Sequence, residues 1–420
     1  MIDLSVVLPA QGETALVGPL LTPLHQALSA AGCRAELLVV VTAEDGDISV
    51  PAGVPARLVR QDAPGYGSAL RAGFATATGA WVLTIDADTA AAPAIAVALW
   101  TRRHDADVVI GSRYVAGGEA RMPPVRRLLS RALNLVFGRG LSLGVRDLSS
   151  GMRIYRADAV RALRELPPHL DVLQAILVEV YAGGWSVVET PVQYAPLPGG
   201  RSHARAWRFA TDYARTFWRL WKLRNSIECA DYDARAHDSV IPLQRYWQRS
   251  RFRHVTELIA GQGPVLDVGC GSSLIIGALP PGSVAVDVLL RKLRYDRRFG
   301  RPRVQGSGFS LPFADASFPC VLCSQVIEHV PKESPILGEL VRVLRPGGRL
   351  VLGTPDYANW EWVATEWLYG KVAPGAYADE HIAHYTCEEL IGRFAALGFT
   401  HEATRYILRG ELILAFRKAN

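Results

Sequence analysis

The sequence predicts an α/β protein of two consecutive domains, and three observations support this. The chain has 420 residues, which at ~100–200 residues per domain corresponds to two or three domains. Its 49% hydrophobic and 20% charged residues are typical of a globular protein rather than a disordered one. Two series of strand-sized apolar runs, alternating with helix-like segments, follow one another. Such alternation favours parallel sheets with ligands at the carboxyl ends of the strands.

The apolar runs define the elements in order. The first series has strand-sized runs at residues 4–8, 36–41, 81–85 and 107–110, and a helix-like segment at 16–31. The second series has runs at 265–268, 284–287, 320–324 and 349–353. We therefore expect the first domain at residues 1–228, a linker or helix at 229–254, and the second domain at 255–420.

Composition also predicts the compartment. No apolar run approaches the ~20 residues of a membrane span. The first residues lack the basic and apolar regions of a secretory signal. Six scattered cysteines do not form a disulfide framework. A cytoplasmic protein is expected, without a nucleic-acid partner.

The net charge of +6 is concentrated in one stretch, residues 201–224, with seven basic residues and one acid. At ~100° per residue, positions 205–222 form an amphipathic helix. One face carries Trp207, Ala210, Ala214, Phe217, Trp218 and Trp221, and the other carries Arg208, Asp212, Arg215, Arg219 and Lys222. Such a helix either lies on an anionic membrane surface or closes the domain with its aromatic face in the core. Both interpretations stay open.

Two carboxylates, Asp86 and Asp88, directly follow the apolar run at 81–85. Side chains at positions i and i+2 at a strand end can hold one divalent cation, and that cation can bridge a diphosphate. A solvated turn is the alternative.

Three further motifs accompany this pair in order: residues 65–74 (GYGSALRAGF), 111–114 (GSRY) and 146–153 (RDLSSGMR). Together the four motifs resemble the family 2 glycosyltransferases of the GT-A fold over roughly residues 3–224. The closest resemblance is to the dolichyl- or polyprenyl-phosphate mannosyltransferases. It implies a nucleotide-sugar donor such as GDP-mannose or a UDP-hexose. It also implies a polyprenyl phosphate or related lipid acceptor, at the inner face of the cell membrane.

The same resemblance assigns roles to individual residues. It implies Mg²⁺ or Mn²⁺ at Asp86 and Asp88, and nucleotide-sugar contacts from Pro9, Glu13, Gly67 and Asp86. It implies that the acceptor or donor phosphate meets Arg113, Arg126, Ser130, Arg153 and Arg201. The family's Arg-x-x-x-Ser-x-x-x-Asn pattern matches Arg126, Ser130 and Asn134, whose spacing of four places them on one helical face.

The sequence departs from the family at several positions. Of the opening Pro-x-Tyr-Asn-Glu motif only Pro9 and Glu13 remain, and Thr89-Ala90 stands where the family has Leu-Gln. The family's Asp-Asp-Gly-Ser is replaced by residues 41–44 (VTAE). These losses motivate an alternative in which the first domain no longer transfers a sugar.

In the second half, a glycine-rich turn, residues 267–271 (DVGCG), follows the run at 265–268. Its glycines allow a tight turn and close backbone approach to a ligand. Leu274 occupies the third glycine position of a dinucleotide fingerprint, which argues against NAD. Asp287 ends the next strand-sized run, where a carboxylate can hydrogen-bond ribose hydroxyls.

Further motifs at 311–313 (LPF), 317–318 (SF), 328–330 (EHV) and 344–350 (LRPGGRL) complete the series. The second half thereby resembles the class I S-adenosylmethionine-dependent methyltransferases, with a Rossmann-like fold, across about residues 255–420. The resemblance implies that Asp267, Gly269 and Gly271 line the methionine part and that Asp287 binds the ribose. It adds Leu311 and Gln325 to the cofactor-binding set.

Three histidines are candidates for acting on the methyl acceptor. His381 and His384 lie in residues 379–386 (DEHIAHYT), where this family often places substrate residues, and His329 lies in the EHV motif. A histidine near neutral pKa can remove a proton from a hydroxyl. Metal binding by His381 and His384 is an alternative, although no third ligand is evident at suitable spacing.

The combined interpretation is a bifunctional enzyme. The first domain transfers a hexose from a nucleotide sugar to a polyprenyl phosphate or related acceptor. The second transfers a methyl group from S-adenosylmethionine to a glycan or lipid-linked intermediate. The alternative is an active methyltransferase fused to a degenerate glycosyltransferase-like binding domain.

Overall fold

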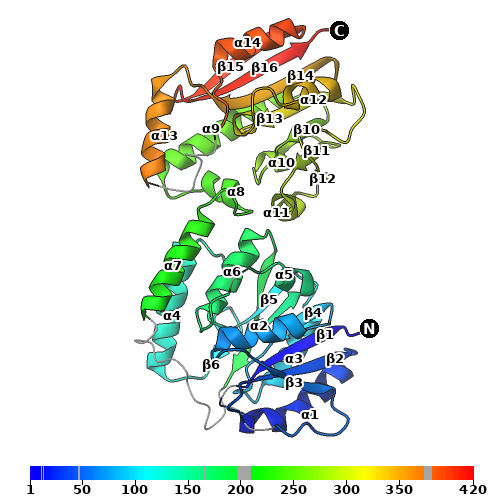
Figure 1. Cartoon of the computed structure of the whole chain (residues 1–420), viewed down its shortest axis with the longest axis vertical. Coiled ribbons are helices and arrows are strands. Elements are labelled where there is room, and N and C mark those ends of the chain that lie inside the picture. The colour runs from blue at the N-terminus through cyan, green and yellow to red at the C-terminus, as the bar shows by residue number, and fades with distance from the viewer. Residues whose placement is uncertain (11, 13, 46–47, 165, 196–209, 373–380) are drawn as a thin grey trace. The chain divides into compact units, whose positions relative to one another are not determined.

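The computed structural model describes the chain except residues 11, 13, 46–47, 165, 196–209 and 373–380. It divides into two compact units, Met1–Arg224 and Asn225–Asn420. Each unit is built around a seven-stranded sheet covered by helices (Figure 1). The predicted fold class, α/β in two consecutive parts, is confirmed.

The sheet of the first unit has the order β3-β2-β1-β4-β7-β5-β8. Its strands are β1 (Leu4–Pro9), β2 (Ala35–Val41), β3 (Ala56–Arg60), β4 (Trp81–Thr84), β5 (Val108–Ser112), β7 (Arg153–Arg156) and β8 (Val187–Pro191). One strand, β7, runs antiparallel between β4 and β5, so the sheet is mixed where alternation predicted a parallel one. Two short strands, β6 (Glu119–Ala120) and β9 (Gln193–Tyr194), pair separately.

Helices cover both faces of this sheet. They are α1 (Thr14–Ala30), α2 (Tyr66–Thr76), α3 (Ala92–Thr101), α4 (Pro124–Gly140), α5 (Ala157–Arg161), α6 (Val172–Ala182) and α7 (Ala210–Arg224). Because alternate residues of a strand face opposite sides, Val6 joins the core beneath α1 and α3, whereas Val7 joins the core beneath α2 and α6. The carboxyl ends of β1 and β4 remain available for a site.

The sheet of the second unit has the order β12-β11-β10-β13-β14-β16-β15. Its strands are β10 (Val265–Val268), β11 (Val284–Asp287), β12 (Arg303–Gln305), β13 (Phe318–Ser324), β14 (Leu344–Pro355), β15 (Phe399–Ile407) and β16 (Glu411–Lys418). From β12 to β14 the strands are parallel, and β15 and β16 close the sheet as an antiparallel pair. The strand order reverses at β10, and ligands bind at such switch points.

The second unit begins with helices in the segment 229–254, which was expected to be a linker or helix. These are α8 (Tyr232–His237) and α9 (Pro242–Ile259), followed by α10 (Ile275–Ala278), α11 (Leu290–Tyr295), α12 (Ile336–Val343), α13 (Trp360–Val372) and α14 (Cys387–Ala396). Two short 3₁₀ helices are η1 (Asp296–Phe299) and η2 (Ile327–His329). Tyr232 and Val255 are buried, so this segment contributes to the core of the unit.

The basic amphipathic helix is described from Ala210 onward as α7, which lies beside α4 (Figure 1). Its Phe217 ring packs 5.2 Å from Phe137 of α4, and Trp221 also contacts the core. Trp218 is 57% exposed and stacks on Trp221. Among the aromatic residues of this face that the structure describes, Phe217 and Trp221 therefore pack half-buried against the core, whereas Trp218 faces solvent. Residues 205–209 of the predicted helix lie outside the described residues.

Candidate active sites

The Asp86–Asp88 pair follows β4, and two tyrosines hold it in place. The Tyr66 hydroxyl donates to Asp86 Oδ1 at 2.9 Å, and the Tyr194 hydroxyl donates to Asp88 Oδ2 at 2.6 Å. Asp88 Oδ1 is buried without a hydrogen-bond partner among the described residues. Burial, and then the neighbouring Asp88, raise the pKa of Asp86 to about 6. Two close carboxylates with an unsatisfied oxygen fit a hard divalent cation such as Mg²⁺ or Mn²⁺.

The RDLSSGMR motif packs directly against this pair. A Cβ on Gly151 would lie within 3 Å of the Tyr66 hydroxyl and of Asp86 Oδ2, so a side chain here would displace the groups that form the site. The Thr84 hydroxyl donates to the Gly151 carbonyl at 2.5 Å. Two motifs that are far apart in the sequence therefore form one site.

Two predicted phosphate-binding arginines have their guanidinium groups engaged by the protein. Arg113 donates to both oxygens of buried Asp147, at 2.7 and 2.8 Å. Arg153 is fully buried and donates to the backbone carbonyls of Leu148, Ser150 and Leu173. The structure thus corrects the role of Arg153: it holds the loop that carries Gly151 and does not face a ligand.

The first helical turns of α4 bring Arg126 and Ser130 toward the same region. Ser130 Oγ lies 3.0 Å from the Tyr114 hydroxyl and 2.9 Å from Ser149 Oγ, and the charge of Arg126 opposes the rise in the pKa of Asp86.

Beside these residues is a cavity of about 380 Å³, which we call the basic cavity. It is lined by Tyr114, Arg131, Asn134, Leu135, Gly138, Arg139, Leu143, Val145 and Arg146. The Asn134 amide is buried without a hydrogen-bond partner among the described residues. Three arginines and an unpaired amide suit an anionic group.

Sequence reasoning missed Arg131, Arg139 and Arg146. Arg146 is the first residue of the RDLSSGMR motif but was given no role of its own, and the only sequence signal for Arg131 and Arg139 is proximity to Ser130. Of the predicted nucleotide-sugar residues, Pro9 ends β1. Gly67 lies in the first turn of α2, where a Cβ would collide with the Pro167 carbonyl, so its absence of a side chain is required for packing. Glu13 and Arg201 lie outside the described residues.

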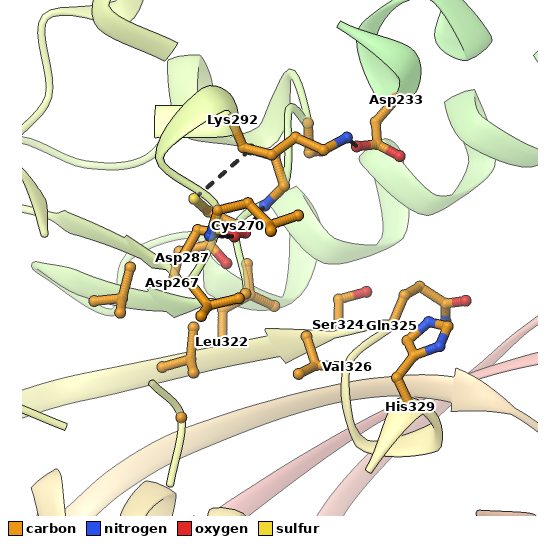
Figure 2. Close-up of a pocket in the computed structure, with 18 of the residues that line it drawn as sticks. Asp233, Asp267, Cys270, Asp287, Lys292, Leu322, Ser324, Gln325, Val326 and His329 are labelled. Atoms are coloured by element: carbon orange, nitrogen blue, oxygen red, sulfur yellow. Dashed lines mark hydrogen bonds and ion pairs between the residues drawn. The ribbon is translucent and has the colours of Figure 1, made fainter. Parts of the chain in front are cut away.

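The second unit has a larger cavity of about 670 Å³ at the carboxyl ends of β10, β11 and β13. Among the residues that line it are Asp267, Gly269, Gly271, Asp287, Gln325 and His329. Figure 2 shows Asp267 and Asp287 near strand ends, with Gln325 and His329 across from them. Gly269 has φ of 72°, and a Cβ there would collide with Val326. We call this the large cavity.

Asp287 organises the glycine turn. Its Oδ2 accepts the Gly271 N–H at 2.9 Å, and its Oδ1 accepts the Leu289 N–H at 2.8 Å. The Gln325 side-chain nitrogen is buried without a hydrogen-bond partner among the described residues. The open turn, the strand-end carboxylate and this unpaired amide fit an adenosine-containing ligand.

Leu311 is the predicted cofactor residue that the structure places elsewhere. It is buried in the core beside Leu340, and its backbone N–H donates to Glu339. It is absent from the described lining of the large cavity. Leu311 therefore supports the wall of the unit and does not line the site.

Two charged residues that sequence reasoning missed, Asp233 and Lys292, line the large cavity (Figure 2). Lys292 Nζ lies 3.1 Å from Asp233 Oδ2, which also accepts the Ser272 hydroxyl at 2.9 Å. No motif marks either residue. Asp233 reaches the cavity from α8, about thirty residues before the glycine turn.

The three candidate histidines lie in one cluster. His329 lines the large cavity, and its ring centroid is 5.1 Å from that of His381. His381 Nδ1 lies 2.7 Å from Glu366 Oε1 and 2.9 Å from the Tyr357 hydroxyl, and His384 stacks on Tyr357. Burial lowers the pKa of His381, although Glu366 opposes this. Sequence reasoning missed Glu366 and Tyr357.

Two buried acids should make the second unit less stable at high pH. Burial raises the pKa of Asp267 to about 7 and that of Asp296 to about 8, above the ordinary value of 3.8. The folded state keeps their protons longer than the unfolded state. The two carboxyl groups therefore make their full contribution to the free energy of unfolding at pH values below their pKa in the unfolded chain. This contribution is lost as the pH rises through 7 and 8, the pKa values in the folded state.

We expect the unfolding temperature of this unit to fall between about pH 5 and pH 8.5. Replacing Asp296 by asparagine, which stays neutral, should flatten the fall. Calorimetry of the full chain checks this, with the exposed residue Glu388→Gln as the control that keeps the slope. If the unfolding temperature of Asp296→Asn fell with pH as steeply as that of the wild type, a raised pKa of Asp296 would be contradicted.

Comparisons with known proteins bear on each unit. Residues 5–164 match the model of Glycosyl transferase family 2, and residues 266–352 match that of a methyltransferase domain. An uncharacterized glycosyltransferase of Mycobacterium tuberculosis (strain H37Rv) is 32% identical over 202 residues, which cover 47% of this chain and 88% of that protein. An uncharacterized methyltransferase of Mycobacterium sp. (strain JLS) is 35% identical over 162 residues, 36% of this chain. The chain spans 61% of that methyltransferase's length.

Solved structures match the second half. The N-methyltransferase NodS from Bradyrhizobium japonicum is 16% identical with a TM-score of 0.32, and the match covers 41% of this chain and 97% of that chain. The YcgJ protein from Bacillus subtilis is 14% identical with a TM-score of 0.33, covering 41% and 99%.

The family matches place the chain among the transferases. Its first unit belongs to glycosyl transferase family 2, and its second unit contains a methyltransferase domain. The expected resemblance to family 2 glycosyltransferases in the first half and to methyltransferases in the second half is confirmed.

Proposed function

We propose that this chain is a two-activity transferase. Its first unit transfers a hexose from a nucleotide sugar, GDP-mannose or a UDP-hexose, to a polyprenyl phosphate or related acceptor. Its second unit methylates a glycan or lipid-linked intermediate with S-adenosylmethionine. The observation that carries the proposal is the presence in one chain of the Asp86–Asp88 pair and of the large cavity with its Asp287-anchored glycine turn.

The geometry of the first unit supports phosphate chemistry. A phosphate acceptor is already ionised at neutral pH, so the site must position it and neutralise charge rather than remove a proton. Arg131, Arg139 and Arg146 of the basic cavity, together with Ser130 and Arg126, supply donors suited to phosphate oxygens. Asp86 and Asp88 would hold Mg²⁺ or Mn²⁺, which would supply charge stabilisation for the departing diphosphate. Arg113 orients the site through Asp147.

The second unit supports methyl transfer to oxygen or nitrogen. Asp287 and the glycine turn would hold the adenosine part of S-adenosylmethionine, which supplies the methyl group. Lys292 and Asp267 would face its charged groups. His329, which lines the large cavity, is placed to take the proton that the acceptor releases.

One surface supports attachment to a membrane. None of the helices in the described chain is long and apolar enough to cross a bilayer. On α4, however, the face opposite Ser130 is apolar and exposed, and it consists of Val125, Leu128, Leu129, Ala132, Leu135 and Val136. Arg127 and Arg131 lie along one edge of this face, and basic residues beside an apolar face are typical of helices that lie on anionic membrane surfaces. We call it the α4 apolar face.

Replacing Leu128 and Val136 by serine should remove most vesicle binding. Burying each side chain in the bilayer interface contributes roughly 1.5 kcal/mol, so the pair should reduce partitioning roughly 100-fold. Co-sedimentation of the full chain with phosphatidylcholine vesicles, with and without phosphatidylserine, measures this. The control pair, Val240→Ser and Ile241→Ser, replaces exposed apolar residues of the second unit and should bind as the wild type does. If the Leu128→Ser, Val136→Ser double variant bound vesicles as the wild type does, the proposal that the α4 apolar face attaches to a membrane would be contradicted.

A single assay separates the proposal from its alternative. The full chain is incubated with labelled GDP-mannose or UDP-glucose, polyprenyl phosphate, Mg²⁺ or Mn²⁺, and labelled S-adenosylmethionine. Formation of a glycosylated lipid that also carries the methyl label supports two activities. Use of S-adenosylmethionine on a preformed glycolipid, with every nucleotide sugar left intact, supports the degenerate glycosyltransferase instead.

A further inference from the structure

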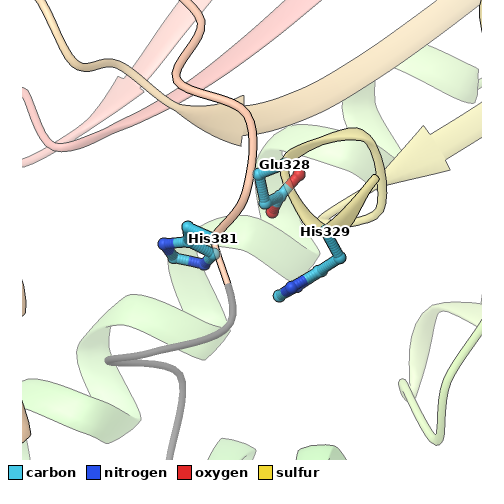
Figure 3. A group of neighbouring side chains, drawn as sticks. All are labelled: Glu328, His329 and His381. Carbon is cyan, nitrogen blue, oxygen red and sulfur yellow. The ribbon is translucent and has the colours of Figure 1, made fainter. Parts of the chain in front are cut away.

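Beside the large cavity, Glu328, His329 and His381 converge from two segments (Figure 3). One potential ligand atom from each lies within 4.8 Å of the others. Glu328 is fully buried, and neither carboxylate oxygen has a hydrogen-bond partner among the described residues. A buried carboxyl group left unpaired is costly unless a proton or a cation satisfies it.

The surrounding contacts fix this cluster in place. The Ile382 and Ala383 N–H groups donate to the Glu328 backbone carbonyl at 2.8 and 3.0 Å, which holds His381 beside Glu328. Glu366 and the Tyr357 hydroxyl both lie at His381 Nδ1, at 2.7 and 2.9 Å. The atom of His381 directed away from Glu366 is therefore Nε2. Metal-binding histidines commonly have such a carboxylate on the opposite ring nitrogen.

We propose that Glu328, His329 and His381 bind one transition-metal cation of the Zn²⁺ or Mn²⁺ type. Two imidazole nitrogens and a carboxylate oxygen are ligands that these ions accept, and three protein ligands leave a position open. A tetrahedral site needs ligand atoms about 3.4 Å apart, so the side chains would have to close by up to about 1.4 Å on binding. The third ligand that the histidine spacing alone did not reveal is Glu328, which the fold brings to the histidines from the EHV motif.

The location gives the open position a use. His329 lines the large cavity, so a cation here lies at its wall. There it would bind the oxygen of an acceptor hydroxyl and lower that hydroxyl's pKa, and with the cation bound His329 is a metal ligand in place of the proton acceptor proposed above. This use rests on the proposed methyl transfer, whereas the binding site itself does not.

The test titrates ZnCl₂ alone into the full chain after chelator treatment, followed by calorimetry. Wild type should bind Zn²⁺ at this site, His381→Ala should bind at least 100-fold more weakly, and Glu328→Gln at least about 10-fold more weakly. His401→Ala, an exposed histidine on β15, is the matched control and should bind as wild type does. A titration with MgCl₂ is a second control. Because Mg²⁺ prefers oxygen ligands, any heat of Mg²⁺ binding should be the same in the wild type and in Glu328→Gln.

Two further measurements guard against misfolding. Co²⁺ in the wild type should give visible absorption bands of a low-coordinate site, and His381→Ala should lose them. Glu366→Gln, which keeps the size of the side chain and leaves the ligands intact, should weaken Zn²⁺ about 10-fold. Absence of Zn²⁺ binding in the wild type, or equal binding in His381→Ala, overturns the proposal. A separate titration with S-adenosylmethionine distinguishes this failure from a failure of the methyltransferase function.

Discussion

Asp287→Ala is expected to weaken S-adenosylmethionine binding by roughly 5- to 150-fold, the equivalent of about 1–3 kcal/mol. The substitution removes a carboxylate placed for the ribose hydroxyls. It also removes the hydrogen bonds that the Gly271 and Leu289 N–H groups donate to the same carboxylate. The glycine turn then loses its anchor, so the loss should approach the upper end. Calorimetric titration of the full chain measures it.

Two controls make this result specific. Asp287→Asn keeps one acceptor oxygen and should fall between wild type and alanine. Asp315→Ala removes a carboxylate whose side chain is largely exposed and lies on the loop before β13, and should leave the affinity unchanged. If Asp287→Ala bound S-adenosylmethionine as tightly as the wild type does, the large cavity would not be the binding site of the methyl donor.

Asp88→Asn should reduce metal-dependent sugar transfer by at least about 100-fold. The amide accepts the Tyr194 hydroxyl as the acid does, so the fold is retained, but it does not neutralise a cation. The buried Oδ1 of Asp88, unpaired among the described residues, is the atom that the substitution affects most directly. Release of nucleoside diphosphate from the nucleotide sugar, with Mg²⁺ or Mn²⁺ supplied, measures the rate.

Asp62→Asn, an exposed acid in the loop before α2, is the matched control and should keep the wild-type rate. Full activity of the wild type in excess chelator would show that Asp86 and Asp88 form only a turn. If higher concentrations of metal restored the activity of Asp88→Asn, the substitution would instead have weakened metal affinity without changing the rate of sugar transfer by the metal-bound enzyme.

The sequence predicted the backbone features of both sites because these depend on local patterns. The apolar run before Asp86, the glycines at 269 and 271, and the acid at the end of β11 all lie where they were expected. Each follows from strand length and turn chemistry, which a short window of sequence contains.

Side-chain direction was harder to predict. Arg153 and Leu311 belong to recognisable motifs, yet both side chains turn into the core. Arg153 lies on β7, whose antiparallel insertion between β4 and β5 no local pattern indicates. Asp233, Lys292 and Glu366 join their sites through tertiary packing alone, so the sequence gives no signal for them.

The two faces of α4 also set a geometric limit on the acceptor. A helix is ~10 Å across, so Ser130 and the α4 apolar face are separated by about one helix diameter. If that face rests on a bilayer, the reacting headgroup has to rise only this far out of the lipid. The hydrocarbon tail stays behind in the membrane, where the protein has no contact with its far end. Acceptors that differ only in tail length should then be used at similar rates, and the enzyme should discriminate among headgroups instead.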